Sequence, residues 1–266
     1  MILIFVCLSA YISYYYVDVV ALDNLWMAGL YGVLSGVVGT GAGGFLACFL
    51  PAKNKRVLSL LLEYSAGLML AVVCFDLLPN AFKYAPLSAV LPGVLAGVFL
   101  MIVSDNVSHK HTGRIRKNSG IKNTGMVIAF GIALHNFLEG MAVGSGFEAE
   151  FTLGISLAIA IMLHDVPEGM SIAIPLRAGG MKRTKAFALA LASGLPMGLG
   201  SVFGVWVGKI TVTYIAVSLA VAGGAMLYIV FVNMLPESKY IYRGRFSSIG
   251  SIAGIISGII VSVKLG

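Results

Sequence analysis

Two short stretches of the sequence place the same polar side chains at the same spacing. They are His135-Asn136-x-x-Glu139-Gly140 and His164-Asp165-x-x-Glu168-Gly169, and they lie 29 residues apart. Residues four apart share one face of a helix, so each histidine stacks with the glutamate of its own motif. Imidazole nitrogen together with carboxylate oxygen suits divalent ions such as Zn²⁺, Fe²⁺ and Mn²⁺. The paired motifs therefore predict a site for a divalent metal ion.

The chain that carries these motifs has the composition of a membrane protein. Hydrophobic residues make up 59% of the sequence and charged residues 11%, whereas soluble domains have about 45–50% apolar and about 25% charged residues. Apolar runs of roughly 20 residues can cross about 30 Å of hydrocarbon, and they must be helical because lipid offers no partner to an unpaired backbone group. We expect an all-α membrane protein, an eight-helix transmembrane bundle. Its spans are expected near residues 27–50, 58–79, 86–105, 124–147, 151–176, 185–208, 213–235 and 247–265.

A further apolar stretch, Met1 to Val20, precedes these spans. It has no basic flank and no small-residue cleavage site, so it makes a poor signal peptide. It is either an extra N-terminal helix across the membrane or a segment at the interface, and the sequence leaves both open. The expected organisation is an N-terminal apolar segment, residues 1–26, followed by one eight-helix domain, residues 27–265.

Both metal-binding motifs fall near the middle of their spans. Ionisable residues inside a bilayer are costly and mark functional sites by default. The short connection between the fourth and fifth spans, about residues 147–151, places the two helices side by side and antiparallel, so that two imidazoles and two carboxylates can converge. A lone histidine here would favour simple interhelical hydrogen bonding, but six polar residues in two matched copies favour a metal. Pro167 is expected to kink the fifth helix and to deprive the carbonyl of Leu163 of its partner.

The distribution of charge predicts the orientation of the chain. The net charge is +7, but 15 of the 18 basic residues lie in alternate short loops between apolar runs, which argues against nucleic acid as a partner and marks those loops as cytoplasmic. Both ends of the eight-helix core then face outward. The longest loop, residues 106–123, is expected to be cytoplasmic and contains His109 and His111. We expect a multi-pass protein of the cell membrane, plasma or inner, with the lipid bilayer as its surroundings.

Glycines repeat every four residues in two of the expected spans. The series are Gly200, Gly204 and Gly208, and Gly250, Gly254 and Gly258. Small residues at this spacing let two helix backbones approach closely. Packing within one bundle is the favoured interpretation, and a homodimer interface is the alternative.

At these residues the sequence resembles the ZIP (zinc/iron permease, ZRT- and IRT-like) family of divalent metal transporters, in its GufA-like bacterial-type branch. The likeness covers about residues 27–265, and its most specific marks are the two motifs above. Supporting marks are Ser65-Ala66-Gly67-Leu68-Met69-Leu70 with Phe75-Asp76-Leu77-Leu78-Pro79, Ser193-Gly194-Leu195, and Ala222-Gly223-Gly224-Ala225-Met226 with Leu235-Pro236-Glu237.

The resemblance implies uptake of metal toward the cytoplasm, with the ion as transported substrate rather than as a cofactor. Zinc is the first expectation, and iron, manganese and cadmium are compatible with the same ligands. It implies ligands at His135, Glu139, His164 or Asp165, and Glu168, with Asn136, Asp165 and the glutamates serving a second, adjacent metal. Met197 stands where several bacterial-type members have a glutamate, which makes one metal position more secure than two.

Other residues are candidates for the path that an ion follows. Met69 falls where a thioether can approach the site, although packing is the commoner role of such a residue. Asp76 is expected near the outer mouth, with Asp105 and Glu237 at inner helix ends. Together these carboxylates could attract cations, and solvation of helix ends explains each of them equally well.

Transport of divalent metal cations is the favoured function. The sequence contains no nucleotide-binding motif, so direct consumption of ATP is not expected. An intramembrane metal-dependent hydrolase is the alternative, because a metal-activated water and a glutamate base could serve hydrolysis. That alternative lacks the H-E-x-x-H pattern and does not explain the repeated motif, so we expect a transporter and not an enzyme.

Overall fold

The computed structural model describes residues 24–49, 55–116, 121–178 and 180–265. Most of the expected N-terminal segment, residues 1–23, lies outside the described residues. The described part of the chain is helical, with no strand, and six of its helical segments are long and apolar enough to cross a membrane. The expectation of an all-α membrane protein is confirmed.

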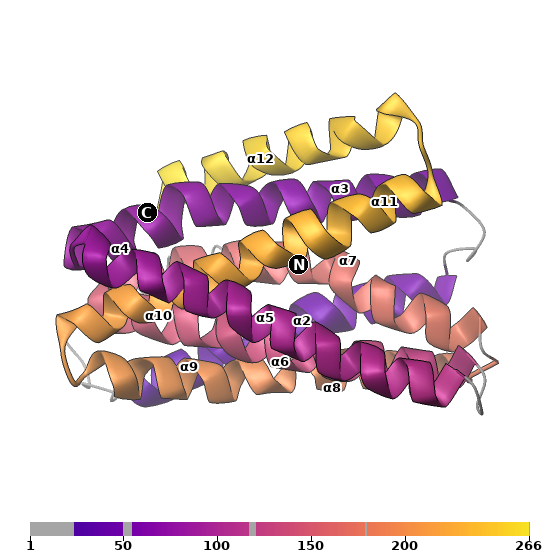
Figure 1. The fold of residues 1–266 in the computed structure, drawn as a ribbon, viewed down its shortest axis with the longest axis horizontal. Coiled ribbons are helices and arrows are strands. Elements are labelled where there is room, and N and C mark those ends of the chain that lie inside the picture. The colour runs from indigo at the N-terminus through magenta and orange to yellow at the C-terminus, as the bar shows by residue number, and fades with distance from the viewer. Residues whose placement is uncertain (1–23, 50–54, 117–120, 179, 266) are drawn as a thin grey trace, which may run out of the picture.

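The helices of the described residues form eight rods that lie side by side along the long axis of the molecule (Figure 1). The first is α2 (Asn24–Phe49), and the second is continuous through α3 (Lys55–Ala71), η1 (Val72–Leu77) and α4 (Leu78–Tyr84). Next come α5 (Leu87–Arg116), α6 (Ile121–Ala149) and α7 (Phe151–Ala178). The sixth rod is α8 (Arg183–Ser193) with α9 (Leu195–Gly208), and the seventh is α10 (Val212–Tyr228), η2 (Ile229–Met234) and α11 (Leu235–Ile241). The last is α12 (Arg245–Leu265).

The segment predicted as a loop over residues 106–123 is mostly helical. Helix α5 continues to Arg116 and α6 begins at Ile121, so helix extends from both sides into the segment expected as a loop. Apolar composition ends where a chain leaves the membrane, but helical hydrogen bonds are local and continue into water without apolar side chains. The side chains of His109 and His111 lie outside the described residues.

Two π-helical turns occupy equivalent places in the second and seventh rods. Each precedes a Leu-Pro pair, with η1 before Leu78-Pro79 and η2 before Leu235-Pro236. A proline inside a helix lacks an N–H and collides with the carbonyl of the preceding turn. The wider π turn removes this collision locally, and the rods therefore continue through their prolines.

The most extensive helix contacts divide the bundle into two groups. The α7 group comprises α2, α6, α7, α8 and α9, in which α6 packs on α9 and α7, and α2 packs on α7, α8 and α9. The α3 group comprises α3, α5, α10 and α12 with the continuous pieces η1, α4, η2 and α11, and its main contacts are α12 with α3 and α10 with α5. The hydrophobic core runs through both groups, and a smaller cluster around Ala47, Met170 and Ala186 joins α2, α7 and α8.

Glycines allow the closest of these contacts. A Cβ placed on Gly254 of α12 would lie 2.0 Å from the carbonyl oxygen of Tyr64 in α3, and one on Gly200 of α9 would lie 1.9 Å from that of Phe137 in α6. Side chains at these positions would separate the helices. The two glycine series therefore serve packing within the bundle.

Several helices of the described residues begin with a basic residue at the same end of the bundle. Helices α3, α8 and α12 begin there with Lys55, Arg183 and Arg245, and α11 ends there next to α12 (Figure 1). The opposite end holds the α6–α7 connection, where Glu150 lies 4.0 Å from Lys83 of α4. The two ends of the bundle thus differ in charge.

Candidate metal centre

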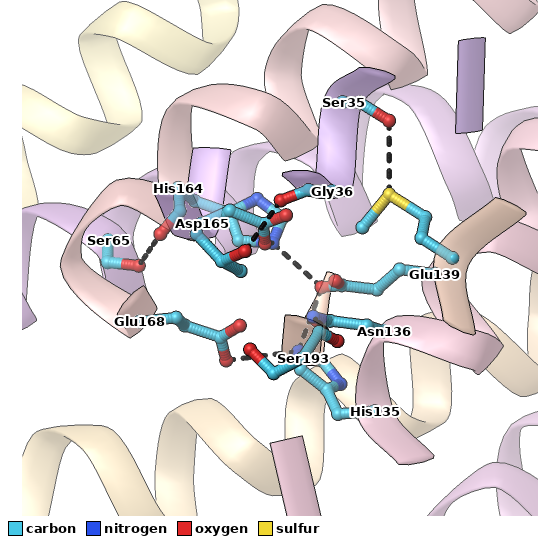
Figure 2. Close-up of polar contacts among 12 residues, drawn as sticks. Ser35, Gly36, Ser65, His135, Asn136, Glu139, His164, Asp165, Glu168 and Ser193 are labelled. Carbon is cyan, nitrogen blue, oxygen red and sulfur yellow. Dashed lines mark hydrogen bonds and ion pairs between the residues drawn. The ribbon is translucent and has the colours of Figure 1, made fainter. Parts of the chain in front are cut away.

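The six residues of the paired motifs converge in the interior of the bundle (Figure 2). Helix α6 supplies His135, Asn136 and Glu139, and the neighbouring α7 supplies His164, Asp165 and Glu168. All six side chains are buried, with Glu168 the most exposed at 6%. The single residue between α6 and α7 forces the two helices to turn back on each other, which brings the matched faces together.

Glu139 lies at the centre of this cluster. Its Oε1 atom is 2.8 Å from Nε2 of His135 and 2.7 Å from Nε2 of His164. Glu168 approaches from α7, with its Oε1 atom 3.4 Å from His135 Nε2, and Oδ1 of Asp165 is 3.5 Å from His164 Nε2. One carboxylate therefore connects both histidines.

The donor atoms form two overlapping sets that could each hold a metal ion. One set is His135, Glu139 and His164, and the other is Glu139, Asp165 and Glu168, with the ligand atoms of each set within 4.8 Å of one another. The first set offers two nitrogens and one oxygen, which suits zinc, and the second offers oxygens alone, which suits harder cations. Glu139 belongs to both.

Several carboxylate oxygens in this cluster have no hydrogen-bond partner among the described residues. Oε2 of Glu139, Oε2 of Glu168 and Oδ2 of Asp165 are buried and accept no hydrogen bond there. Carboxylates buried in this way are strongly unfavourable unless a positive charge compensates them. A divalent cation bound among them would supply that charge.

Asn136 has a different role from the other five residues. Its Nδ2 atom donates to the carbonyl of Ser193 at 2.9 Å, which ties α6 to α8. Its Oδ1 atom is buried without a hydrogen-bond partner among the described residues. The amide is thus oriented by one end, and its free oxygen is the end that could bind a cation.

The glycine that ends each motif explains how α6 and α7 are held in place. A Cβ on Gly140 would lie 1.9 Å from the carbonyl oxygen of Met197 in α9, and one on Gly169 would lie 2.0 Å from that of Thr40 in α2. Each glutamate faces the cluster of candidate ligands, and the glycine that follows it packs directly on the backbone of a neighbouring helix. The motif therefore combines a ligand with a close helix contact.

Ser65 was not identified as a neighbour of the site by sequence reasoning. Its hydroxyl, on α3, donates to the backbone carbonyl of His164 at 2.9 Å (Figure 2). Helix α7 runs as one element from Phe151 to Ala178 through Pro167. Pro167 is expected to leave the carbonyl of Leu163 without a partner, which stays a prediction. The bond from Ser65 reaches the carbonyl of the next residue, His164. Sequence spacing reveals no partner for a serine on a distant helix.

The two methionines of the predicted pathway are buried. Met69 on α3 and Met197 on α9 are both inaccessible to solvent. The sulfur of Met197 accepts a hydrogen bond from the Ser35 hydroxyl of α2 at 3.0 Å (Figure 2). Met197 therefore has a partner on α2 beside the cluster.

The three pathway carboxylates are not brought to the cluster. Asp76 is buried and its Oδ1 atom accepts from the Ser262 hydroxyl of α12 at 2.8 Å. Asp105 accepts from the Tyr228 hydroxyl at 3.0 Å, and Glu237 lies in the first turn of α11. Their role in ion passage stays a prediction.

Comparison with known proteins identifies the family of the chain. The sequence model of the family described as ZIP Zinc transporter matches residues 102–265. The chain is similar to zinc transporter GufA of Myxococcus xanthus, at 36% identity over 179 residues that cover 65% of this chain and 69% of that protein. It is also similar to zinc transporter ZupT of Corynebacterium aurimucosum, at 32% identity over 246 residues that cover 84% of this chain and 91% of that protein. Human zinc transporter ZIP11 is 37% identical over 147 residues, which cover 53% of this chain and 43% of that protein. This chain belongs to the ZIP family of zinc transporters.

Proposed function

We propose that the protein carries divalent metal ions, zinc first, across the cell membrane toward the cytoplasm, and that the α6–α7 cluster holds the ion in passage. The observation that carries the proposal is the pair of ligand sets that share Glu139 near the middle of α6 and α7. The relatives named as zinc transporters support the choice of zinc. They are transporters, so the hydrolase alternative is set aside.

The expected orientation follows from the basic end of the bundle. Cytoplasmic loops are enriched in lysine and arginine, and the ends of α3, α8 and α12 that begin with basic residues would then face the cytoplasm. The end with Glu150 would face outward, as would Asn24 and Leu265. An ion would enter from the Glu150 end and leave at the basic end.

The two helix groups suggest how the ion changes sides. All six candidate ligands lie on the α7 group, and α3 and α10 of the other group pack against it. Movement of one group against the other would expose the site first to one side and then to the other, as in other transporters with a midplane site. Ligands must lose protons to bind metal, so proton release accompanies loading.

The occupancy of the site follows from its donors. The His135, Glu139 and His164 set is the better match to zinc, and we propose that it holds the transported ion. The Glu139, Asp165 and Glu168 set offers an adjacent position. Met197 contributes a thioether beside the site where a carboxylate would have completed that second position.

Transport in liposomes tests the proposal. Purified protein would be reconstituted and the entry of Zn²⁺, Fe²⁺, Mn²⁺ and Cd²⁺ measured for the wild type, His164→Ala and Glu168→Ala. Ile256→Ala is the control, because this residue of α12 is 53% exposed and belongs to neither ligand set. We expect the two site variants to lose most of their flux and the control to retain it. Equal flux in all four proteins would refute the proposed site.

A further inference from the structure

One face of α3 is held firmly to its own helix group. Glu63 is buried, and its Oε1 atom lies 2.8 Å from Nζ of Lys239 and accepts from the Ser238 hydroxyl of α11 at 3.2 Å. Its Oε2 atom accepts from the Ser251 hydroxyl of α12. On the same side, a Cβ on Gly67 would lie 2.0 Å from the carbonyl oxygen of Ser251. A charged pair, two hydroxyl contacts and a backbone contact thus hold α3 against α11 and α12.

Another face of α3 meets the helix that carries half of the metal ligands. Ser65 follows Glu63 by two residues, which is about 200° around a helix, and its hydroxyl donates to the carbonyl of His164 at 2.9 Å. Ser65 and His164 are both fully buried. The contact across this face is made by a neutral, short side chain. It can be broken and remade without unfolding either helix.

The Ser65 bond differs from other interhelical hydrogen bonds of the bundle in what it connects. Ser201 of α9 donates to the carbonyl of Ala28 in α2 at 2.7 Å, which lies within the α7 group. Tyr228 of α10 donates to Asp105 of α5 at 3.0 Å, which lies within the α3 group. Ser65 instead joins the α3 group to the α7 group, and it does so at the backbone of a candidate ligand.

We propose that Ser65 is a positioning residue for transport, whose hydroxyl holds α7 against α3 in the conformer described here and must release His164 before the site can change sides. The proposal rests on the proposed function, because it assumes that the α7 group carries the ion. A helical carbonyl has two lone pairs, so His164 can accept from Ser65 without losing its place in α7. Releasing this backbone bond leaves the His164 imidazole and the other candidate ligands in place.

The test compares two serine-to-alanine variants that each remove a buried hydroxyl bonded to a carbonyl of another helix. Ser65→Ala removes the bond between the groups, and Ser201→Ala removes the bond within one group. The average free energy of an interhelical hydrogen bond in a membrane protein corresponds to a factor of about three in a rate. Because Ser65→Ala removes a bond that must break before the site changes sides, we expect its maximal rate of Zn²⁺ uptake to rise about three-fold. Ser201→Ala should keep the wild-type rate. Ser65→Thr retains the hydroxyl and should restore a rate near that of the wild type.

Zinc affinity, measured by titration of the same purified proteins, separates this role from that of a residue that shapes the site. Ser65→Ala should bind Zn²⁺ as the wild type does. An unchanged or lower uptake rate in Ser65→Ala would overturn the proposal, and so would a rise of the same size in Ser201→Ala. A loss of Zn²⁺ affinity in Ser65→Ala would assign the residue to the site instead. The proposed function fails separately, if His164→Ala keeps full Zn²⁺ binding and uptake.

Discussion

The glycine that follows each motif glutamate offers a sharp test of the site geometry. In Gly169→Ala the new Cβ would lie 2.0 Å from the carbonyl oxygen of Thr40, whereas real Cβ contacts stay above 3.0 Å. Backbone atoms on both sides prevent relief by rotation of a side chain. Helix α7 must therefore move away from α2 by about 1 Å, taking the difference between these two distances.

This displacement has two measurable costs. Overpacking of a dense core typically costs about 1–3 kcal/mol, which should appear as a lower midpoint of thermal unfolding in detergent. Glu168 precedes Gly169 and must move with it, and changes to residues that hold metal ligands in place typically lower metal affinity by about 10–100-fold. We expect Zn²⁺ affinity, measured by calorimetric titration, to fall by at least about ten-fold.

Gly41→Ala on α2 is the matched control. Its Cβ would meet only Leu191, at 3.5 Å from Cδ1, which is ordinary van der Waals contact. Alanine is favoured over glycine inside a helix by about 1 kcal/mol, so this variant should be as stable as the wild type or more so, with unchanged Zn²⁺ binding. If Gly169→Ala matched Gly41→Ala in both measurements, the argument that close backbone contact sets the site would be wrong.

Three further outcomes follow from the structure. Glu139→Gln should weaken Zn²⁺ binding more than Glu168→Gln does, because Glu139 belongs to both ligand sets. We expect a loss of at least about 100-fold, since even residues that only support metal ligands affect affinity by about 10–100-fold. Equal losses in a titration would contradict the shared role. Lowering the pH from about 7.5 to about 5.5 should weaken Zn²⁺ binding, because imidazole and carboxylate ligands must lose protons to bind metal, and binding that is insensitive to pH would rule out these ligands. Glu63→Gln should lower the free energy of unfolding by about 1.5–3 kcal/mol, the contribution of a hydrogen bond to a charged group, and should leave Zn²⁺ affinity unchanged. A change in affinity without a change in thermal stability would show that Glu63 acts on the site and not on the α3 group.

The local features of this protein could be predicted without a structure. Apolar runs of membrane length determine the helices, since each backbone group in lipid must be bonded within its own segment. The four-residue spacing places His135 with Glu139 and His164 with Glu168 on common faces, and the short connection after α6 makes the two faces neighbours. These predictions are met because they depend only on the periodicity of a helix and on chain connectivity.

The rotation and height of one helix against another were decided by tertiary packing. Glu139 lies between both histidines because Gly140 and Gly169 set α6 and α7 against the backbones of α9 and α2. The same packing turns Asp76 toward Ser262 and brings Ser65 to the carbonyl of His164. Sequence alone determined which residues could bind a metal and on which helix faces they lie. Only the folded bundle decided which carboxylate the two histidines share and where the boundary between the α3 group and the α7 group lies. The reason is that contacts between distant helices leave no fixed spacing along the chain.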